Sequence, residues 1–242
     1  MKPPLHSALV TGGSRGIGAA IAQRLRHDGF RIVVLDRIAP EHDAVDAFHE
    51  VDLADAQATF AAAEQAASAG HVTRFVHNAG IVRPASVSET READFDTVMA
   101  INLRAAITIT RALLPGMREA GVGRIVTIAS RAALGKELRS AYAASKAGLI
   151  GLVKTWALEL GREGITANAV GPGPIATALF EAANPPDAPA TKRIREAIPV
   201  ARMGTADDVA NAVSFFCDER AGFVTGQVLY VCGGMTVGAA SH

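Results

Sequence analysis

A glycine-rich turn between a strand and a helix is the feature that most constrains the fold of this chain. The apolar run Ser7–Thr11 predicts a buried strand, the turn Thr11-Gly-Gly-Ser-Arg-Gly-Ile-Gly18 follows at once, and Ala19–Arg26 has helical periodicity. Such a turn lets the backbone approach a pyrophosphate, whose charge then meets the helix N-terminus. The next apolar run ends in Asp36, whose carboxylate can accept hydrogen bonds from a free ribose 2′-hydroxyl. This order of elements predicts a dinucleotide-binding unit, although three glycines alone also occur in ordinary loops.

The rest of the chain alternates between strand and helix patterns. Five further strands are expected, at Arg31–Asp36, Thr73–His77, Gly123–Ala129, Thr166–Val170 and Gln227–Val231. Helical patterns occupy Ala54–Ala69, Glu92–Glu119, Ser140–Gly161 and Ala206–Cys217. Repeated alternation with right-handed crossovers predicts an α/β fold, a doubly wound parallel sheet with helices on both faces. The length of 242 residues fits one domain spanning residues 1–242.

A second motif carries chemistry. Tyr142 and Lys146 stand four positions apart in a predicted helix, so their side chains share one face. A free tyrosine has a pKa of about 10, and a nearby ammonium favours the phenolate, so we expect Lys146 to lower the pKa of Tyr142. The hydroxyl of Ser130 can orient a substrate carbonyl or alcohol at the same oxygen. Together these residues predict proton transfer at a carbon–oxygen bond; the Tyr–Lys spacing alone also occurs on solvated helix faces.

Composition excludes several classes of function. Lysine and arginine balance aspartate and glutamate at 24 each, so no electrostatic footprint for nucleic acid or an anionic membrane is expected. The sequence has no uncharged apolar span of 18 residues and no signal-peptide core at its start, which predicts a cytoplasmic protein without a membrane segment. The two cysteines, Cys217 and Cys232, make neither a disulfide framework nor a zinc site, and no metal is expected.

In combination these motifs resemble those of the short-chain dehydrogenase/reductase family, from Ser7 to about Gly238. The matching segments are Thr11–Gly18, Asn78-Ala79-Gly80, Asn102, Ser130, the Tyr142/Lys146 pair, Pro172-Gly173 and Thr177. The resemblance implies a single Rossmann-type domain and an NAD(P)-dependent oxidoreductase that interconverts a secondary alcohol and a ketone. It also implies a homotetramer.

The resemblance assigns roles to individual residues. The implied catalytic residues are Asn102, Ser130, Tyr142 and Lys146. Tyr142 would be the general acid/base, Lys146 would also bind the nicotinamide ribose, and Asn102 would anchor a water for proton relay. The implied cofactor-binding residues are Gly12, Ser14, Arg15, Gly16, Ile17, Gly18, Asp36, Arg37, Asp52, Leu53, Asn78, Ala79, Gly80, Tyr142, Lys146, Pro172, Gly173, Ile175 and Thr177. Asp52 can instead be the N-cap of the helix predicted from Ala54.

The choice of cofactor depends on three residues. Asp36 favours NAD(H), because its carboxylate would repel a 2′-phosphate. Arg15 and Arg37 stand where relatives that use NADP often keep a phosphate partner. We expect NAD(H) to be favoured over NADP(H), with use of both left open. His77, which replaces an asparagine of many relatives, is expected to have little effect.

The expected substrate is a small-molecule alcohol or ketone, held by Ser130, Tyr142, Arg131 and Arg139. The cations Arg131, Lys136 and Arg139 could meet a carboxylate or could be solvated loop charges. An alternative is a 3-oxoacyl-[acyl-carrier-protein] reductase that uses NADPH. Arg124 stands where those relatives have an arginine. Glu163 stands where they commonly have another basic residue, which counts against docking of a carrier protein.

A non-catalytic dinucleotide-binding redox sensor is a third possibility, which the intact catalytic set disfavours. The segment 178–203, which contains the proline-rich stretch Ala182–Pro199 and a short predicted helix near Thr191–Ala197, stands where this family has its substrate lid. A plain surface loop is the alternative for this segment.

Overall fold

A parallel sheet of seven strands forms the middle layer of the structure, a computed structural model that describes residues 6–185 and 187–237. The strands are β1 (Ser7–Thr11), β2 (Arg31–Asp36), β3 (Ala47–Glu50), β4 (Val72–His77), β5 (Gly123–Ile128), β6 (Ile165–Pro172) and β7 (Val228–Val231), in the order β3-β2-β1-β4-β5-β6-β7. All six expected strands are present, and the predicted doubly wound α/β fold is confirmed. The seventh strand, β3, was not predicted; it is a short edge strand that pairs with β2 and has no fully buried residue.

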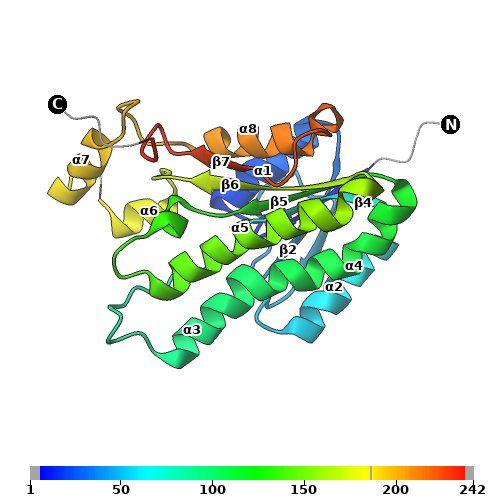
Figure 1. Cartoon of the computed structure of the whole chain (residues 1–242), viewed down its shortest axis with the longest axis horizontal. Helices are drawn as coiled ribbons and strands as arrows, with labels where there is room; N and C mark the ends of the chain where they lie inside the picture. The colour runs from blue at the N-terminus through cyan, green and yellow to red at the C-terminus, as the bar shows by residue number, and fades with distance from the viewer. Residues whose placement is uncertain (1–5, 186, 238–242) are drawn as a thin grey trace.

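Helices cover both faces of this sheet (Figure 1). They are α1 (Gly16–His27), α2 (Ala56–Ser68), α3 (Glu92–Met99), α4 (Ala105–Ala120), α5 (Ser140–Leu160), α6 (Ala178–Ala183), α7 (Pro189–Glu196) and α8 (Ala206–Cys217), with the short turns η1 (Ala100–Arg104), η2 (Arg131–Leu134), η3 (Gly161–Glu163) and η4 (Glu219–Ala221). Helices α1 and α8 pack together on one face, and α2, α4 and α5 cover the other.

The core divides into two clusters because successive strand residues point to opposite faces. Leu9 and Phe75 pack with the α4–α5 side, whereas their neighbours Val10 and Val76 pack with α1 and α8. All four side chains are fully buried. Burial on both faces explains why the inner strands are continuous apolar runs rather than alternating ones.

The prediction of one continuous helix over Glu92–Glu119 is wrong, because the helix is interrupted near its middle. The π-helical turn η1 separates α3 from α4, and Asn102 lies at its centre. A π-turn changes the hydrogen-bond ladder locally without a signature in the apolar periodicity, and such turns are frequent at functional sites.

Within the described residues, the helical stretch Glu92–Ala120, counted across the π-turn, is the one long and apolar enough to cross a membrane. However, 56% of its most apolar window is buried inside the fold.

The order of the strands places a topological switch point beside β1. The chain runs from β1 outward to β2 and β3, then returns to β4 on the other side of β1. At the carboxyl ends of β1 and β4 the connections diverge, and this is where ligands bind in doubly wound sheets. Thr11 pairs with His77 at this point. Helices α6 and α7 lie beyond the carboxyl end of β6 (Figure 1).

Candidate active site

The glycine turn has the geometry of a pyrophosphate cradle. Gly12 and Gly16 have φ values of +62° and +56°, in the left-handed region that favours glycine. A Cβ added at Gly18 would lie 1.9 Å from the carbonyl oxygen of Gly12, so the helix can approach the turn this closely only without a side chain. The N-cap residue Arg15 makes no side-chain hydrogen bond to the first turn of α1. The free N–H groups and the helix dipole fit an anionic pyrophosphate.

Asp36 is held beside this turn by backbone groups. Its two carboxylate oxygens accept hydrogen bonds from Ser14 N at 3.2 Å and from Arg37 N at 2.7 Å. The Ser14 hydroxyl donates to the carbonyl of Ile38. The carboxylate is therefore fixed at the end of β2, where a dinucleotide of this fold has its adenosine ribose. Arg15 is exposed, and the Arg37 side chain is 70% exposed.

Asp52 does not cap α2. The N-cap is Asp55, which accepts hydrogen bonds from Gln57 N and Ala58 N, whereas Asp52 accepts one from Ala54 N in the preceding turn. Half of the Asp52 side chain is exposed, and Leu53 beside it is buried. The capping alternative for Asp52 is therefore wrong, and its contact with an adenine remains a prediction.

Asn78 and Ala79 tie β4 to the glycine turn. The Asn78 amide donates to the carbonyls of Thr11 at 3.2 Å and Gly12 at 2.9 Å. The backbone N–H groups of Asn78 and Ala79 both donate to the Thr11 hydroxyl, at 3.0 and 3.1 Å. A Cβ added at Gly80 would lie 3.2 Å from Lys146 Nζ, so this segment connects the turn to the Tyr–Lys pair.

The Tyr142–Lys146 pair lies on α5 beside the end of β5. The Lys146 ammonium donates to the carbonyl of Ile128 at 2.7 Å and lies 5.7 Å from the centre of the Tyr142 ring. Burial lowers the pKa of Lys146 to about 8. Burial also raises the pKa of Tyr142 above its ordinary value, against the opposing effects of a hydrogen bond to Ser130 and the charge of Arg139. The expected lowering of the Tyr142 pKa by Lys146 is thus wrong for this structure, because desolvation of the phenol dominates.

The π-turn holds Asn102 against the same pair. Its side-chain oxygen accepts from Ile81 N at 2.8 Å, and its amide donates to the carbonyl of Ile81 at 3.0 Å and to the Ser145 hydroxyl at 3.1 Å. Ser145 in turn donates to the carbonyl of Tyr142 at 2.8 Å. Asn102 is therefore linked to α5 through Ser145. Gly80 lies between Asn102 and Lys146, since a Cβ added there would be 3.4 Å from Asn102 Oδ1 as well as 3.2 Å from Lys146 Nζ.

The segment after β6 approaches the glycine turn from the opposite side. A Cβ on Gly16 would lie 3.9 Å from the Thr177 methyl group. The Thr177 hydroxyl caps α6 by accepting from Phe180 N. Gly173 packs against Cys232, and Ile175 pairs with Gly204. Within the expected lid, 178–203, the structure contains α6 and α7, and Pro186 lies outside the described residues.

The loop between Ser130 and Tyr142 carries a group of cations. Lys136 is exposed, but partial desolvation by the surrounding loop lowers its pKa, and the charges of Arg139 and Arg131 act in the same direction. Arg139 is the N-cap residue of α5, and its charge also acts on the Tyr142 phenol. None of the three forms an ion pair with an acid among the described residues.

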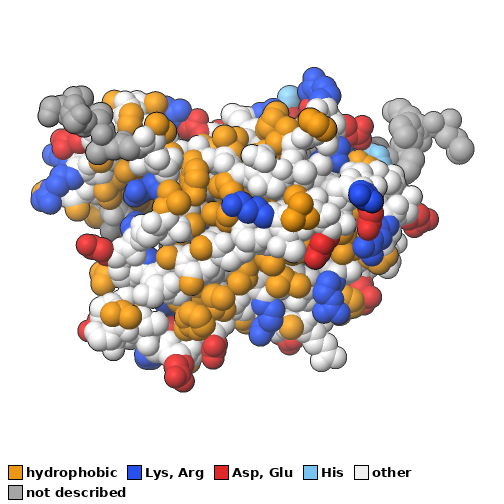
Figure 2. All heavy atoms as spheres, viewed as in Figure 1, with side chains coloured by type: hydrophobic (Ala, Val, Ile, Leu, Met, Phe, Trp, Pro, Cys, Tyr) orange, Lys and Arg blue, Asp and Glu red, His pale blue; other side chains and the backbone are white. Residues whose placement is uncertain are grey.

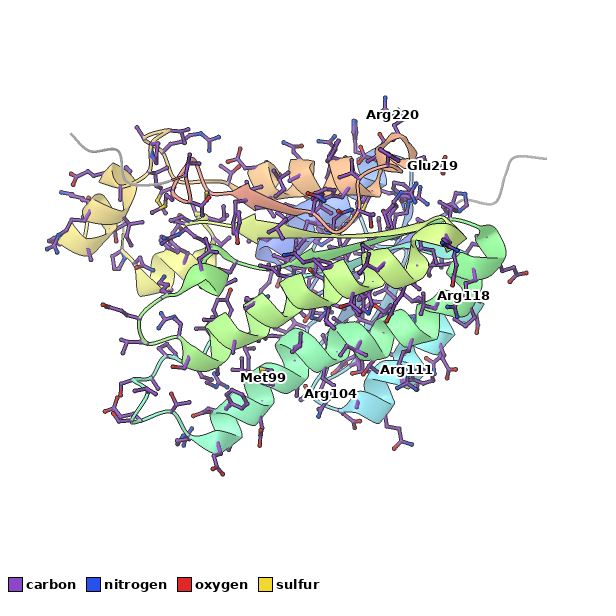
Figure 3. All side chains as sticks on the ribbon, viewed as in Figure 1. Met99, Arg104, Arg111, Arg118, Glu219 and Arg220 are labelled. Carbon is purple, nitrogen blue, oxygen red and sulfur yellow. The ribbon has the colours of Figure 1, made fainter. Side chains whose placement is uncertain are left out.

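The two positions considered for a carrier protein have other partners. Arg124 is 5% exposed and donates to the backbone carbonyls of Gly123 and Gly164. Glu163 forms a bidentate ion pair with Arg118. Arg118 lies at the end of the molecule away from α6 and α7 (Figure 3).

Comparison with known proteins agrees with this geometry. A family model described as Enoyl-(Acyl carrier protein) reductase matches residues 12–236. The chain is 37% identical over 241 residues to (2S)-[(R)-hydroxy(phenyl)methyl]succinyl-CoA dehydrogenase of Thauera aromatica, with 95% of this chain and 96% of that one covered. It is 38% identical over 239 residues to a 3-oxoacyl-[acyl-carrier-protein] reductase of Mycobacterium avium, covering 96% and 91%. The chain belongs to the short-chain dehydrogenase/reductase family.

Solved structures of the family extend the comparison to the cofactor. One, described as an NAD(P)-dependent gluconate 5-dehydrogenase from Beutenbergia cavernae with bound NADP, has a TM-score of 0.90 at 35% identity, covering 96% of this chain and 97% of that one. Another, described as a 2-deoxy-D-gluconate 3-dehydrogenase from Agrobacterium tumefaciens with bound NADP, has a TM-score of 0.88 at 36% identity, covering 96% of each.

This short-chain dehydrogenase/reductase is therefore an oxidoreductase that acts on CH–OH groups with a nicotinamide dinucleotide. Because the neighbouring structures carry NADP, the comparisons do not support a preference for NAD.

Proposed function

We propose that this enzyme is an NAD(H)-linked dehydrogenase of a small metabolite that carries a carboxylate or similar anionic group. The observation that carries the proposal is a group of three cations, Arg131, Lys136 and Arg139, on the loop that joins Ser130 to Tyr142. None of them forms an ion pair with an acid in the part of the chain that the structure describes. Neighbouring cations raise one another's electrostatic energy, and an anionic substrate relieves that cost. Two structural neighbours are described as dehydrogenases of gluconates, which are carboxylates.

The chain's own residues handle the proton. When bound, the nicotinamide supplies the hydride transfer. Tyr142 takes the alcohol proton in oxidation and returns it in reduction, and Ser130 orients the substrate oxygen. Because the pKa of Tyr142 is raised, the phenol is protonated near pH 7 and suited to donate in reduction, whereas oxidation gains as the pH rises. Lys146 and Asn102 support proton exchange with solvent.

NAD(H) is the proposed cofactor because both oxygens of the Asp36 carboxylate are held beside the glycine turn by backbone N–H groups. A fixed negative charge there opposes the 2′-phosphate of NADP(H). The two nearby arginines are exposed, and neither pairs with Asp36.

A 3-oxoacyl-[acyl-carrier-protein] reductase that uses NADPH is the second candidate, favoured by the Mycobacterium avium relative. The burial of Arg124 and the Arg118–Glu163 ion pair give it less support, since neither position offers a free cation to an acidic carrier protein. A non-catalytic redox sensor receives no support from a site that keeps Asn102, Ser130, Tyr142 and Lys146 together.

The homotetramer and the cytoplasmic location rest on the family. In the single chain, Leu158 of α5 is 86% exposed and Phe223 is fully exposed. Figure 2 shows hydrophobic side chains over α4 and α5 between scattered charges of both signs. Exposed apolar groups of this kind are compatible with burial between subunits.

Turnover of matched substrates tests the proposal. NAD⁺ reduction with D-gluconate is compared with D-glucitol, its uncharged counterpart, and NADPH oxidation is followed with acetoacetyl-CoA. We expect activity with gluconate to exceed that with glucitol, and Arg131→Gln and Arg139→Gln to raise the KM for gluconate by about tenfold each. Arg162→Gln, at an exposed arginine of η3, is the control. Equal activity on both polyols, or activity on acetoacetyl-CoA alone, contradicts the proposal.

Tyr142→Phe tests the reaction itself. We expect turnover to fall by about 10²–10⁴-fold, because the general acid/base is gone. The Kd for NADH should stay within about threefold of wild type, since the turn and Asp36 are intact. Turnover like that of the wild type would exclude Tyr142 as the proton carrier.

A further inference from the structure

His77 joins the glycine turn to the π-turn. It is the last residue of β4, its side chain is fully buried, and it pairs with Thr11 across the sheet. Its ring nitrogens contact Thr11 Oγ1 and the backbone oxygen of Asn102, both at 3.1 Å. The side chain therefore spans the switch point between the cofactor-binding turn and the segment that carries a catalytic residue.

The neighbouring hydrogen bonds determine where the ring proton lies. The Thr11 hydroxyl oxygen already accepts from the N–H groups of Asn78 and Ala79. Its own proton is thus available to His77 Nδ1, which then acts as the acceptor. The Nε2 atom must carry the ring proton and donates it to the carbonyl of Asn102.

The ring stays neutral under working conditions. Burial lowers the pKa of His77 to about 3, and the charge of Lys146 acts in the same direction. A neutral ring keeps one donor and one acceptor, so the chain of hydrogen bonds from Asn78 through Thr11 and His77 to Asn102 has a single polarity.

This series of hydrogen bonds ends at Asn102, in the proposed proton-transfer site. The Asn102 side chain is bound to Ile81 and to Ser145, and Ser145 is bound to the carbonyl of Tyr142. The hydrogen bond from His77 holds the backbone carbonyl of Asn102 itself. Displacing that carbonyl would shift Asn102 relative to Lys146 and Tyr142, whose geometry the reaction needs.

We propose that His77 is a positioning residue, which holds the π-turn of Asn102 in register with the dinucleotide-binding turn. The inference rests on the proposed oxidoreductase function and concerns kcat rather than cofactor affinity. The His77 ring meets the cofactor-binding turn at the Thr11 hydroxyl, whereas the carbonyl that it holds belongs to the segment that carries Asn102.

Three variants of β4 test the role. His77→Phe keeps the size of the ring without its polar atoms, His77→Gln can accept from Thr11 and donate to Asn102, and His77→Asn reaches only Thr11. Val76→Ala is the control, because it removes buried volume from the same strand on the opposite face without touching the network. All are assayed at a temperature where circular dichroism shows them folded, with gluconate and acetoacetyl-CoA as probes.

We expect kcat to fall by roughly tenfold or more in His77→Phe and His77→Asn, a loss typical of misplaced catalytic groups. The Kd for NADH or NADPH should stay within about threefold, and His77→Gln and Val76→Ala should keep kcat near wild type. If His77→Phe does not fold, the kcat of His77→Gln is compared with that of His77→Asn, and a lower kcat in His77→Asn supports the proposal. Unchanged kcat in His77→Asn, or an equal loss in Val76→Ala, would overturn the proposal. A wild-type protein that neither binds nor oxidises a nicotinamide cofactor would instead refute the proposed function.

Discussion

Neutralising Asp36 should relax the selection against NADP(H). In Asp36→Asn the side chain keeps its size and one oxygen to accept from Ser14 N or Arg37 N, so the end of β2 should keep its shape. The variant loses only the negative charge and one charge-assisted acceptor. It therefore isolates the electrostatic contribution of the carboxylate to cofactor choice.

The expected size follows from the position of the carboxylate. Two unit charges about 4 Å apart interact with about 4 kcal/mol at an effective dielectric constant of about 20. Asp36 is partly exposed, and salt together with the two nearby arginines reduces this repulsion, so we take about 2 kcal/mol. At 1.36 kcal/mol per tenfold, Asp36→Asn should tighten NADPH binding by about 30-fold. Binding of NADH should weaken by about fivefold, because hydrogen bonds from the ribose to a neutral amide are weaker.

Fluorescence titration of NADH and NADPH against both proteins at fixed ionic strength measures these changes. The matched control is Asp46→Asn, whose carboxylate also accepts a backbone N–H, from Ile32 at 2.8 Å, but at the other end of β2. Its two dissociation constants should equal those of wild type. An unchanged NADPH affinity in Asp36→Asn, or a wild type that already prefers NADPH, would refute the assignment of Asp36 as the selector.

Three further predictions concern the fold around the site. Gly18→Ala should abolish measurable NADH binding, because its Cβ would lie 1.9 Å from the Gly12 carbonyl oxygen, whereas Gly161→Ala, with open space around its Cβ, should bind normally. The pKa of His77 is about 3 in the folded chain, against 6.5 for a free ring. Between these pH values the unfolded state binds a proton that the folded state does not, so the free energy of unfolding decreases as the pH is lowered below 6.5, by up to about 1.4 kcal/mol per pH unit. Urea unfolding of wild type and His77→Gln should therefore converge as the pH falls from 6.5 to 4, and parallel curves would contradict the shift. Arg118→Gln should leave the urea midpoint close to that of wild type in the same assay, since it breaks an exposed ion pair.

Much of the fold could be predicted because the inner strands are buried on both faces. In β2 the four inner residues, Ile32–Leu35, are all apolar, and the predicted bounds Arg31–Asp36 match the structure residue for residue. The edge strand β3 carries no such pattern: it reads Ala-Phe-His-Glu and is at best half-buried. Its place depends on pairing with β2, which is a tertiary contact. Edge strands are thus the elements that apolar runs reveal least.

The candidate site divides in the same way. The structure brings together the glycine turn, Asp36, Asn78 and the Tyr142–Lys146 pair, which the motifs predicted, because these motifs encode local backbone geometry and helical spacing. The direction of the Tyr142 pKa shift could not be predicted, because it depends on burial by the surrounding elements. The spacing predicted that Tyr142 and Lys146 share one helix face, but it carries no information on the desolvation of their side chains.

His77 is the clearest case of a role that a motif could not reveal. A histidine before Asn78 differs from the asparagine of many relatives, and the sequence offered no reason to expect more than a neutral replacement. The structure places the ring against η1, where its Nε2 atom bonds the backbone carbonyl of Asn102 at the centre of the π-turn. A substitution in one strand and a local change of helix type thus have to be considered together. Neither is informative alone, and their combination links the glycine turn to the π-turn that carries Asn102 through a single buried side chain.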